Sequence, residues 1–443
     1  MNKFIINHLD KVFMTKDTAI MCRELDINHP AAKLIVNAGK MQETEQGDNT
    51  NLVLTFAGEA LNLAAQLIKS GVHPSDVLIG YEKAWNKCVE LLESVPTYKL
   101  SDLKSIEEVT KIIKSSIGSK MLQSQEIILA PLISQACINV LPPKVEDFNH
   151  ENVRVAKILG GSLIDSLVIK GLVVIRAVEG TVTTVENCNV AVFNCPLETQ
   201  GAETKDTVVF KSADELLNYS RSEEDHMEGI IKEIVNSGVK AVIVGGSISD
   251  MAIHFLDKYG VLVFRIMSKF ELRRIAKALG ASMLVRLGAP TKEEMGYADR
   301  IYVDEISSQK CIVIVREAEE NRLSTVIVRG STFNMLDNIE RIIEDGVNTY
   351  KATCKDTTFV PGAGAIEMYL SNGIKEFGKT VTSLDQYAIA KFGEAFEVVP
   401  RTLSENSGLN VNEVIANLNS KNIEDPHMGI NIKVCNLFIL FTY

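Results

Sequence analysis

The sequence predicts an α+β protein of several domains, in which mostly helical segments at both ends of the chain flank an inserted mixed unit. Three observations predict this class. Helical periodicity dominates up to about residue 140 and returns after residue 330. Between these points, short β-branched runs alternate with helices. A chain of 443 residues is also too long for one ordinary core, so it should form two or three domains.

The first segment predicts a short hairpin followed by helices. Residues 4–6 and 12–14 are apolar runs around a polar turn, which is typical of two paired strands. The clearest helix spans residues 52–69, where apolar side chains recur at helical spacing and Gly71 lies just past the end. An acidic turn at residues 47–51 precedes this helix.

From about residue 142 the pattern changes to strands and then to a compact alternation of strands and helices. Capping boxes at residues 212–215 and 268–271 open two helices, which Gly238 and Gly280 end. Residues 333–350 begin the second helical segment. Between these helices we expect strands at residues 167–175, 190–193, 241–244, 261–264, 301–303, 311–315 and 325–328, and one more helix at 249–259.

Composition and charge indicate a cytosolic protein. With 46% hydrophobic residues and a net charge of -11, the surface should repel phosphate backbones and acidic lipid headgroups, so we expect neither nucleic acid nor membrane partners. The eight cysteines include no CxxC pair, which is typical of reduced thiols. No signal peptide is visible, and the apolar end at residues 434–443 is shorter than the roughly 20 residues that cross a bilayer.

The acidic turn suggests one half of a site for a metal-bound nucleotide. A helix N-terminus presents unpaired N–H groups, so residues 49–52 would suit phosphate oxygens, and the adjoining Asp48 carboxylate would suit Mg²⁺. The simpler alternative is that the turn only caps the helix.

Other acids and glycines, far away in the sequence, would complete such a site. Asp345 lies on the polar face of the helix at 333–350, and Asp17 follows a strand. Gly362 and Gly364 would let the backbone approach a ligand closely. The alternatives are a solvated carboxylate, a turn residue and ordinary loop glycines.

Two further patterns have their own alternatives. Residues 242–247 resemble a degenerate dinucleotide loop without GxGxxG, which leaves open an unrelated nucleotide-dependent αβ enzyme. A basic stripe at spacing i, i+4, i+8 is either a solvated face or a surface that contacts peptides. Our candidates for contact with a polypeptide substrate are Lys269, Phe270, Arg273 and Lys277.

Several segments, taken in chain order, resemble group II chaperonins. Residues 47–51 (GDNTN) resemble the GDGTT or GDGTN turn of that family, and residues 157–162 (KILGGS) resemble its KxxGGS loop. Residues 340–346 (ERIIEDG) and 361–365 (PGAGA) resemble its ER…D and GGGA pair. The stretch 386–408 is also similar, so the resemblance covers essentially the whole chain except its last few residues.

The resemblance implies a chaperonin fold of three domains. A helical equatorial ATPase domain would come from residues 1–116 and 365–443. An intermediate domain, residues 117–180 and 329–364, would join it to an apical substrate-binding domain with a helical protrusion, residues 181–328. Such a protein would be an ATP-dependent chaperone subunit that binds unfolded polypeptide and works with other chaperonin subunits in a hetero-oligomeric double ring.

The resemblance also implies roles for individual residues. Asp48 would hold Mg²⁺, Asp345 would position or deprotonate the attacking water with the help of Asp17, and Lys157 would sense the γ-phosphate of ATP. Phosphoryl transfer needs mainly charge neutralisation and an aligned water, for which paired carboxylates and a metal suffice. The nucleotide-binding set would be Gly47, Asp48, Asn49, Thr50, Asn51, Lys157, Gly362, Ala363 and Gly364.

The chain departs from the family pattern at several positions. Asn49 replaces the central glycine of GDGTT, Ala363 replaces the middle glycine of GGG, and Ile20 stands where the family usually has threonine. Met1 falls just after the place of the family's LGPxG phosphate loop, and the final equatorial helices would follow the carboxyl end, so we expect truncation at both ends. The alternative function is a structural ring subunit with impaired or absent ATP hydrolysis.

Overall fold

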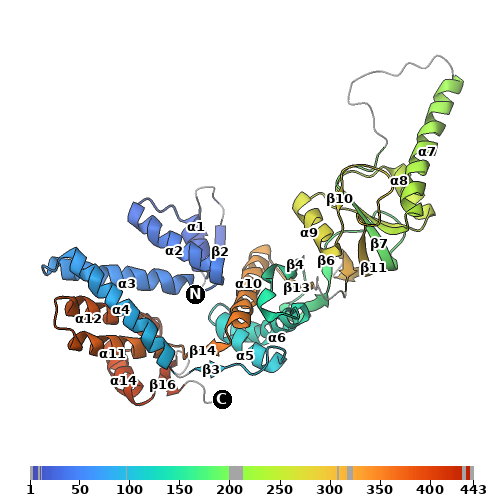
Figure 1. The fold of residues 1–443 in the computed structure, drawn as a ribbon. Helices are drawn as coiled ribbons and strands as arrows, with labels where there is room; N and C mark the ends of the chain where they lie inside the picture. The colour runs from blue at the N-terminus through green and yellow to red at the C-terminus, as the bar shows by residue number, and fades with distance from the viewer. Residues whose placement is uncertain are drawn as a thin grey trace. The chain divides into compact units, whose positions relative to one another are not determined.

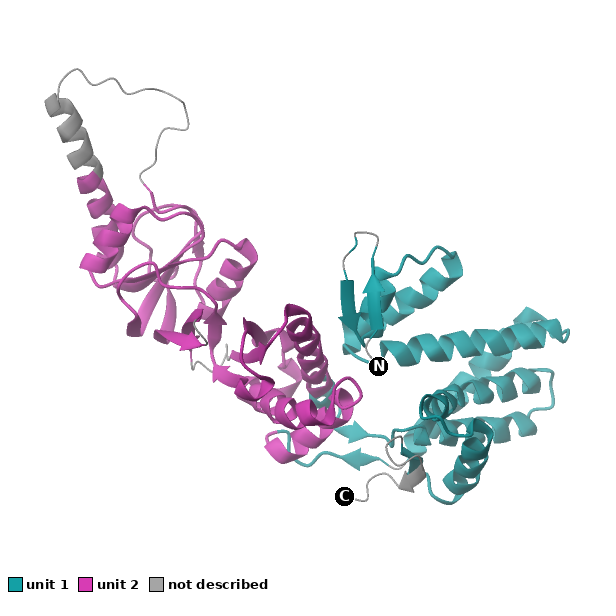
Figure 2. Cartoon of the chain, turned by 180° about the vertical axis from the view of Figure 1, so that it is seen from behind, with its two compact units in different colours: residues 1–103, 352–443 teal, residues 104–351 magenta. Residues whose placement is uncertain are grey.

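Figure 1 shows the computed structural model of the protein, which describes residues 3–7, 10, 12–95, 97–198, 213–306, 309–316, 323–431 and 436–439. The chain forms two compact units, coloured separately in Figure 2. Unit 1 contains residues 1–103 and 352–443, and unit 2 contains residues 104–351. Both terminal segments therefore belong to one unit, and the middle of the chain forms the other.

Unit 1 is mainly helical. The predicted hairpin is present, since β1 (Lys3–Ile6) pairs antiparallel with β2 (Val12–Thr15). The first segment continues with α1 (Thr18–Glu24), α2 (Pro30–Gln46), α3 (Thr50–Lys69), α4 (Pro74–Ser94) and β3 (Tyr98–Lys99). The last segment contains β14 (Thr358–Phe359), α11 (Ala365–Thr380), α12 (Asp385–Ala395), α13 (Val398–Asn406), α14 (Val411–Glu424), β15 (Met428–Asn431) and β16 (Asn436–Ile439). Antiparallel pairing of β3 with β14 joins the two segments.

Close helix crossings hold unit 1 together. Helix α4 meets α12 at Gly80, where a Cβ atom would lie only 2.5 Å from the Cβ of Ala388. The rings of Phe56, Phe392 and Phe396 lie with centroids between 4.6 and 5.7 Å apart, which fixes α3 against the region of α12. Among the described helices, α3 alone is long and apolar enough to cross a membrane by length and composition. Its Leu67 is nevertheless buried against α4 and α12 in unit 1.

The first part of unit 2 combines helices with a three-stranded sheet. Its helices are α5 (Ile106–Ile117), α6 (Gln123–Val140) and most of α10 (Phe333–Lys355), whose last four residues belong to unit 1. The 3₁₀ turns are at Val145–Asp147, His150–Asn152 and Leu163–Asp165. Strand β13 (Ser324–Gly330) is central, parallel to β4 (Val153–Leu159) and antiparallel to β5 (Leu167–Lys170).

The second part of unit 2 is a seven-stranded sheet with helices α7 (Ala213–Asn236), α8 (Asp250–Lys258) and α9 (Lys269–Leu279). Its path is β6 (Leu172–Val174), β12 (Gln309–Val315), β11 (Gly296–Ile306), β7 (Thr184–Phe193), β8 (Val239–Val244) and β9 (Leu262–Arg265), with β10 (Met283–Leu284) beside β7. Ser212 of the predicted capping box lies outside the described residues. At the other box, the Ser268 hydroxyl accepts a hydrogen bond from the Glu271 N–H.

One predicted strand is divided. The run at residues 167–175 becomes β5 and β6, which belong to different sheets. The break falls at Gly171, which has φ 126° and passes so close to β12 that a Cβ atom would lie 2.3 Å from the Ile314 carbonyl oxygen. Only glycine tolerates both conditions.

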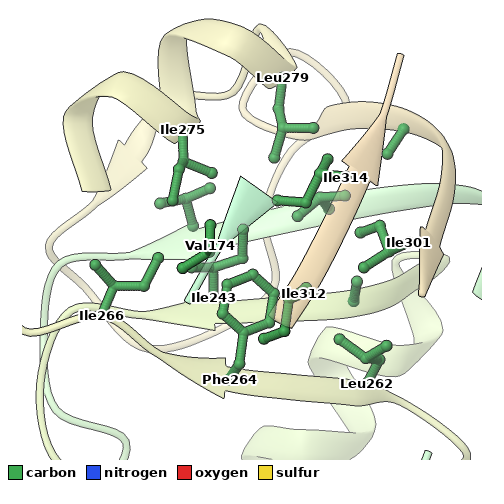
Figure 3. Packing of buried hydrophobic residues seen from close by; sticks show 14 of the residues in the cluster. Val174, Ile243, Leu262, Phe264, Ile266, Ile275, Leu279, Ile301, Ile312 and Ile314 are labelled. Carbon is green, nitrogen blue, oxygen red and sulfur yellow. The ribbon is translucent and has the colours of Figure 1, made fainter. Parts of the chain in front are cut away.

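Both faces of the seven-stranded sheet are buried. Consecutive strand residues point to opposite sides and join different apolar clusters. Ile243 and Phe264 pack under α9 with Ile275 and Leu279, as Figure 3 shows. Their neighbours Val242 and Val263, among others, form a separate cluster with α7 and α8. The β-branched runs of the sequence therefore mark a sheet that is covered by helices on two sides.

Candidate functional site

The acidic turn connects α2 to α3 through two residues in left-handed conformation. Gly47 has φ 78° and ends α2, and Asn49 has φ 65° and precedes α3. The Asp48 carboxylate accepts a hydrogen bond from the Asn49 N–H at 2.7 Å. The Asn49 side chain makes no capping hydrogen bond to α3. The N-cap residue itself therefore does not cap α3 through its side chain, and the geometry of the turn is compatible with phosphate at the start of α3.

Helix α2 holds this turn in place. The Gln42 side-chain amide donates to the Asp48 carbonyl oxygen at 3.2 Å. At Gly39 a Cβ atom would lie 3.1 Å from Cγ2 of Thr50, which is itself buried. Sequence reasoning missed Gln42 and Gly39, because neither belongs to a motif with its own chemistry.

Asp17 caps helix α1. Its Oδ1 atom accepts a hydrogen bond from the Ala19 N–H at 2.9 Å, so the turn-residue alternative describes part of its role. Burial and the negative charge of Asp17 together raise the pKa of Glu43, near the end of α2. Asp17 therefore lies in the same helical cluster as the acidic turn, since α1 contacts both α2 and α3.

The second glycine turn precedes α11. Ala363 has φ 53° and Gly364 has φ 84°, and the Ala363 carbonyl oxygen accepts a hydrogen bond from the Ile430 N–H at 3.0 Å. Gly364 is required for packing, since a Cβ atom there would lie 3.1 Å from the Cβ of Pro400. Gly362 is exposed and has open space around it, which suits close approach of a ligand.

Asp345 differs from the solvated carboxylate that its helical position allowed. Its Oδ2 atom lies 2.6 Å from Nζ of Lys120, and only 16% of the Asp345 side chain and 19% of the Lys120 side chain are exposed. Lys120 follows α5 in a turn, where its N–H donates to the Ile117 carbonyl oxygen. Sequence reasoning missed Lys120, because only the folded unit shows its carboxylate partner.

Lys157 is also paired with acids. Its Nζ lies 2.7 Å from Oδ1 of Asp337 and 2.7 Å from Oε2 of Glu340, both on α10. Although burial opposes the charged form, these two hydrogen bonds raise the pKa of Lys157 above its ordinary value. The glycine loop that follows is anchored as well, since Nε of Arg329 donates to the Gly160 carbonyl oxygen at 2.8 Å.

The basic stripe on α9 is exposed along its length. Lys269, Arg273 and Lys277 face solvent, while Leu272 and its neighbours on the stripe's opposite side are buried. Phe270 adds a large exposed apolar side chain beside them. This combination suits a surface that contacts polypeptide.

The rival glycine turn is filled by the protein itself. At Gly245 a Cβ atom would lie 2.6 Å from Cδ2 of Leu272, and at Gly246 it would lie 2.8 Å from Cα of Pro196. Gly245 therefore permits packing between the sheet and α9, and Gly246 permits close approach of Pro196, so packing accounts for both glycines without a bound dinucleotide.

The predicted site residues are divided between the units. Unit 1 contains Asp17, the acidic turn and the turn at 362–364, and unit 2 contains Asp345 and Lys157. Within the described residues, no three His, Cys, Asp or Glu side chains are grouped for a metal ion. A single carboxylate such as Asp48 still fits Mg²⁺, which usually binds through one or two carboxylates together with phosphates and waters.

Comparison with known proteins decides the family. Residues 1–438 match the model of the TCP-1/cpn60 chaperonin family. The chain belongs to this family. T-complex protein 1 subunit theta of Dictyostelium discoideum is 46% identical over 98% of the chain and 81% of that protein. The proteins of the same name from Homo sapiens and Arabidopsis thaliana are 44% and 45% identical, over 98% and 94% of this chain and 79% and 76% of theirs.

Membership in the chaperonin family confirms the predicted resemblance and the α+β fold class. It also confirms, at the level of the family, an ATP-dependent molecular chaperone subunit. Residues 272–274, 329–332 and 345–349 look most like the theta subunit of the eukaryotic cytosolic chaperonin, in agreement with the names of these relatives.

Proposed function

We propose that this chaperonin chain binds and hydrolyses Mg–ATP with the residues that its sequence singled out. The observation that carries the proposal is the turn between α2 and α3, where Gln42 and Gly47 fix the backbone and no Asn49 side-chain bond caps α3. N–H groups at the start of α3 and around Gly362 would bind phosphate oxygens, and Asp48 would hold Mg²⁺.

Asp345 is the proposed base. When bound, Mg²⁺ would neutralise charge on the phosphates. The Asp345 carboxylate would orient the attacking water and accept its proton, and Asp17 would assist. The ion pair with Lys120 fixes the direction of the Asp345 carboxylate. Lys157, now paired with two acids, would exchange them for the γ-phosphate.

An ATPase assay of the purified chain tests the proposal, with Asp345→Ala and Asp48→Asn as variants. We expect Asp345→Ala to lower kcat by about 10²- to 10⁴-fold while ATP still binds, as is typical for loss of a general base. In the Asp48→Asn chain, ATP binding should depend less strongly on the Mg²⁺ concentration. Asp304→Asn, an exposed acid on β11, is the matched control.

The possible outcomes separate two functions. Hydrolysis that Asp345→Ala leaves unchanged would contradict the assignment of Asp345. A wild-type chain that binds ATP without hydrolysing it would instead support the structural ring subunit, an alternative favoured by Ala363 in a left-handed turn where the family has glycine.

The remaining features of the proposal concern partners and location. By analogy with the family, the chain would join other chaperonin subunits in a cytoplasmic hetero-oligomeric ring, without nucleic acid or membrane partners. Unfolded clients would contact Lys269, Phe270, Arg273 and Lys277 on α9. The double variant Lys269→Glu with Arg273→Glu should weaken capture of an unfolded model client while leaving the circular dichroism unchanged, and undiminished capture would exclude this surface.

A further inference from the structure

A groove in unit 1 has no part in the proposed nucleotide chemistry. It runs between α11 and α12, reaches Leu67 at the end of α3, and encloses about 450 Å³. This volume is within the range of specific binding pockets, roughly 300–1,000 Å³. All of its lining residues belong to unit 1.

The walls of the groove follow helical spacing. Helix α11 contributes Lys375, Gly378 and Lys379, at i, i+3 and i+4. Helix α12 contributes Gln386, Ala390 and Glu394, at i, i+4 and i+8, with Tyr387 and Lys391 beside them. Rows at these spacings form the ridges between which a third helix packs.

The groove has a floor of small side chains and an apolar wall. Gly378 and Ala390 lie where α11 and α12 touch, since a Cβ atom at Gly378 would lie 3.3 Å from Cγ2 of Ile389 and 3.6 Å from the Ala390 backbone nitrogen. Tyr387 supplies exposed apolar surface, Leu67 lies buried at the bottom of the groove, and Leu384, just before α12, is 62% exposed. Small residues below and larger apolar ones around them suit insertion of a large apolar side chain.

The charges around the groove favour an acidic partner. The buried Glu397 pairs with both Lys375 and Arg401, so one positive charge there is not compensated. Lys391 pairs with Glu394 at 2.6 Å. Lys379 is exposed and makes no ion pair in the part of the chain that the structure describes. Of the four charged residues that line the groove, three are lysines and one is Glu394, so the lining carries an excess of positive charge on a chain whose net charge is -11.

We propose that this groove binds an amphipathic helix of a partner protein, with acidic residues beside its apolar stripe. An apolar side chain of that helix would lie over Gly378 and Ala390, beside Tyr387, and a carboxylate would meet Lys379. Helix-in-groove recognition uses this combination of apolar anchors and flanking charges. The inference does not depend on ATP binding or hydrolysis.

A peptide-binding assay tests the groove. The probe is a fluorescent synthetic helix with a leucine stripe flanked by glutamates, and its matched control carries lysines in place of the glutamates. We expect Lys379→Glu to weaken binding of the acidic probe by about tenfold, since a rim attraction is lost and a repulsion replaces it. Ala390→Phe should abolish binding by filling the floor. Lys421→Glu, at an exposed position on α14, should change nothing.

Three binding results and one displacement result would overturn the inference. The binding results are no binding of the acidic probe to the wild-type chain, equal binding of the two probes, and equal affinity of the wild-type and Lys379→Glu chains. Displacement of the probe by vesicles of anionic phospholipid would reassign the groove to a lipid surface and overturn it as well. Lys379→Glu changes an exposed residue, so unit 1 should stay folded. Trp85, the one tryptophan, lies in unit 1, and its fluorescence checks this.

Discussion

Unit 1 and unit 2 build their parts of the candidate site by different means. In unit 1 the two turns depend on backbone conformation, with positive φ at Gly47, Asn49, Ala363 and Gly364. In unit 2 the important side chains are held by ion pairs, between Lys120 and Asp345 and around Lys157. The difference teaches that backbone N–H groups are positioned by the conformation of a turn, whereas partly buried charged side chains are positioned by counter-charges on neighbouring elements.

The ion pair between Asp345 and Lys120 gives the prediction with the largest expected effect on stability. Lys120→Met should lower the stability of unit 2 by about 2–3 kcal/mol, because it removes the ammonium partner of a mostly buried carboxylate. Hydrogen exchange of the α5 and α10 amides measures the loss. The double variant Lys120→Met with Asp345→Asn should recover most of the stability, since the amide carries no charge. Unchanged exchange in the single variant would mean that the pair contributes nothing.

The pairs of Lys157 should matter less, because about a third of each side chain is exposed. We expect Lys157→Met to cost about 0.5–1 kcal/mol, and the difference to vanish near 1 M salt, where screening acts over about 3 Å. The Lys120→Met effect should persist in that salt, and equal salt sensitivity would refute the distinction.

The same pairs give a pH dependence with a definite sign. Since the folded pKa of Lys157 lies above its ordinary value of 10.5, its stabilising contribution is complete below pH 10.5 and is lost as the pH rises through the folded value. The Lys157→Met chain should lack this alkaline component. Denaturation followed between pH 9 and about 11.5 would measure it, relative to a chain with Lys292→Met, an exposed lysine elsewhere in unit 2.

The sequence predicts helices, strands and turns better than it predicts which side chains meet in the folded protein. Helices such as 52–69 and most of the seven-stranded sheet, although not β10 or the first parts of β7 and β11, are visible in hydrophobic periodicity, and the turns are visible in their glycines and asparagine. The partners Lys120, Asp337 and Gln42 are not visible, because an isolated charged or amide residue has no periodicity and its partner lies elsewhere in the chain. The division at Gly171 is also not visible, since it depends on the approach of β12.

The smallest expected effect is the most direct test of the backbone argument for unit 1. Ala363 has φ 53°, a conformation that costs an L-residue about 1–2 kcal/mol. Ala363→Gly should remove this strain but increase the freedom of the unfolded chain, which offsets about 0.4–1 kcal/mol. A net gain of about 0.5 kcal/mol should remain, measured as a higher denaturant midpoint of Trp85 fluorescence. Asn49→Gly is the matched control and should lose a little stability, because asparagine tolerates this conformation and the greater freedom of the unfolded chain is then not offset by relief of strain. If both variants gained equally, or if Ala363→Gly lost stability, the turn before α11 would not be strained by its alanine, and the backbone half of the comparison would fail at that turn.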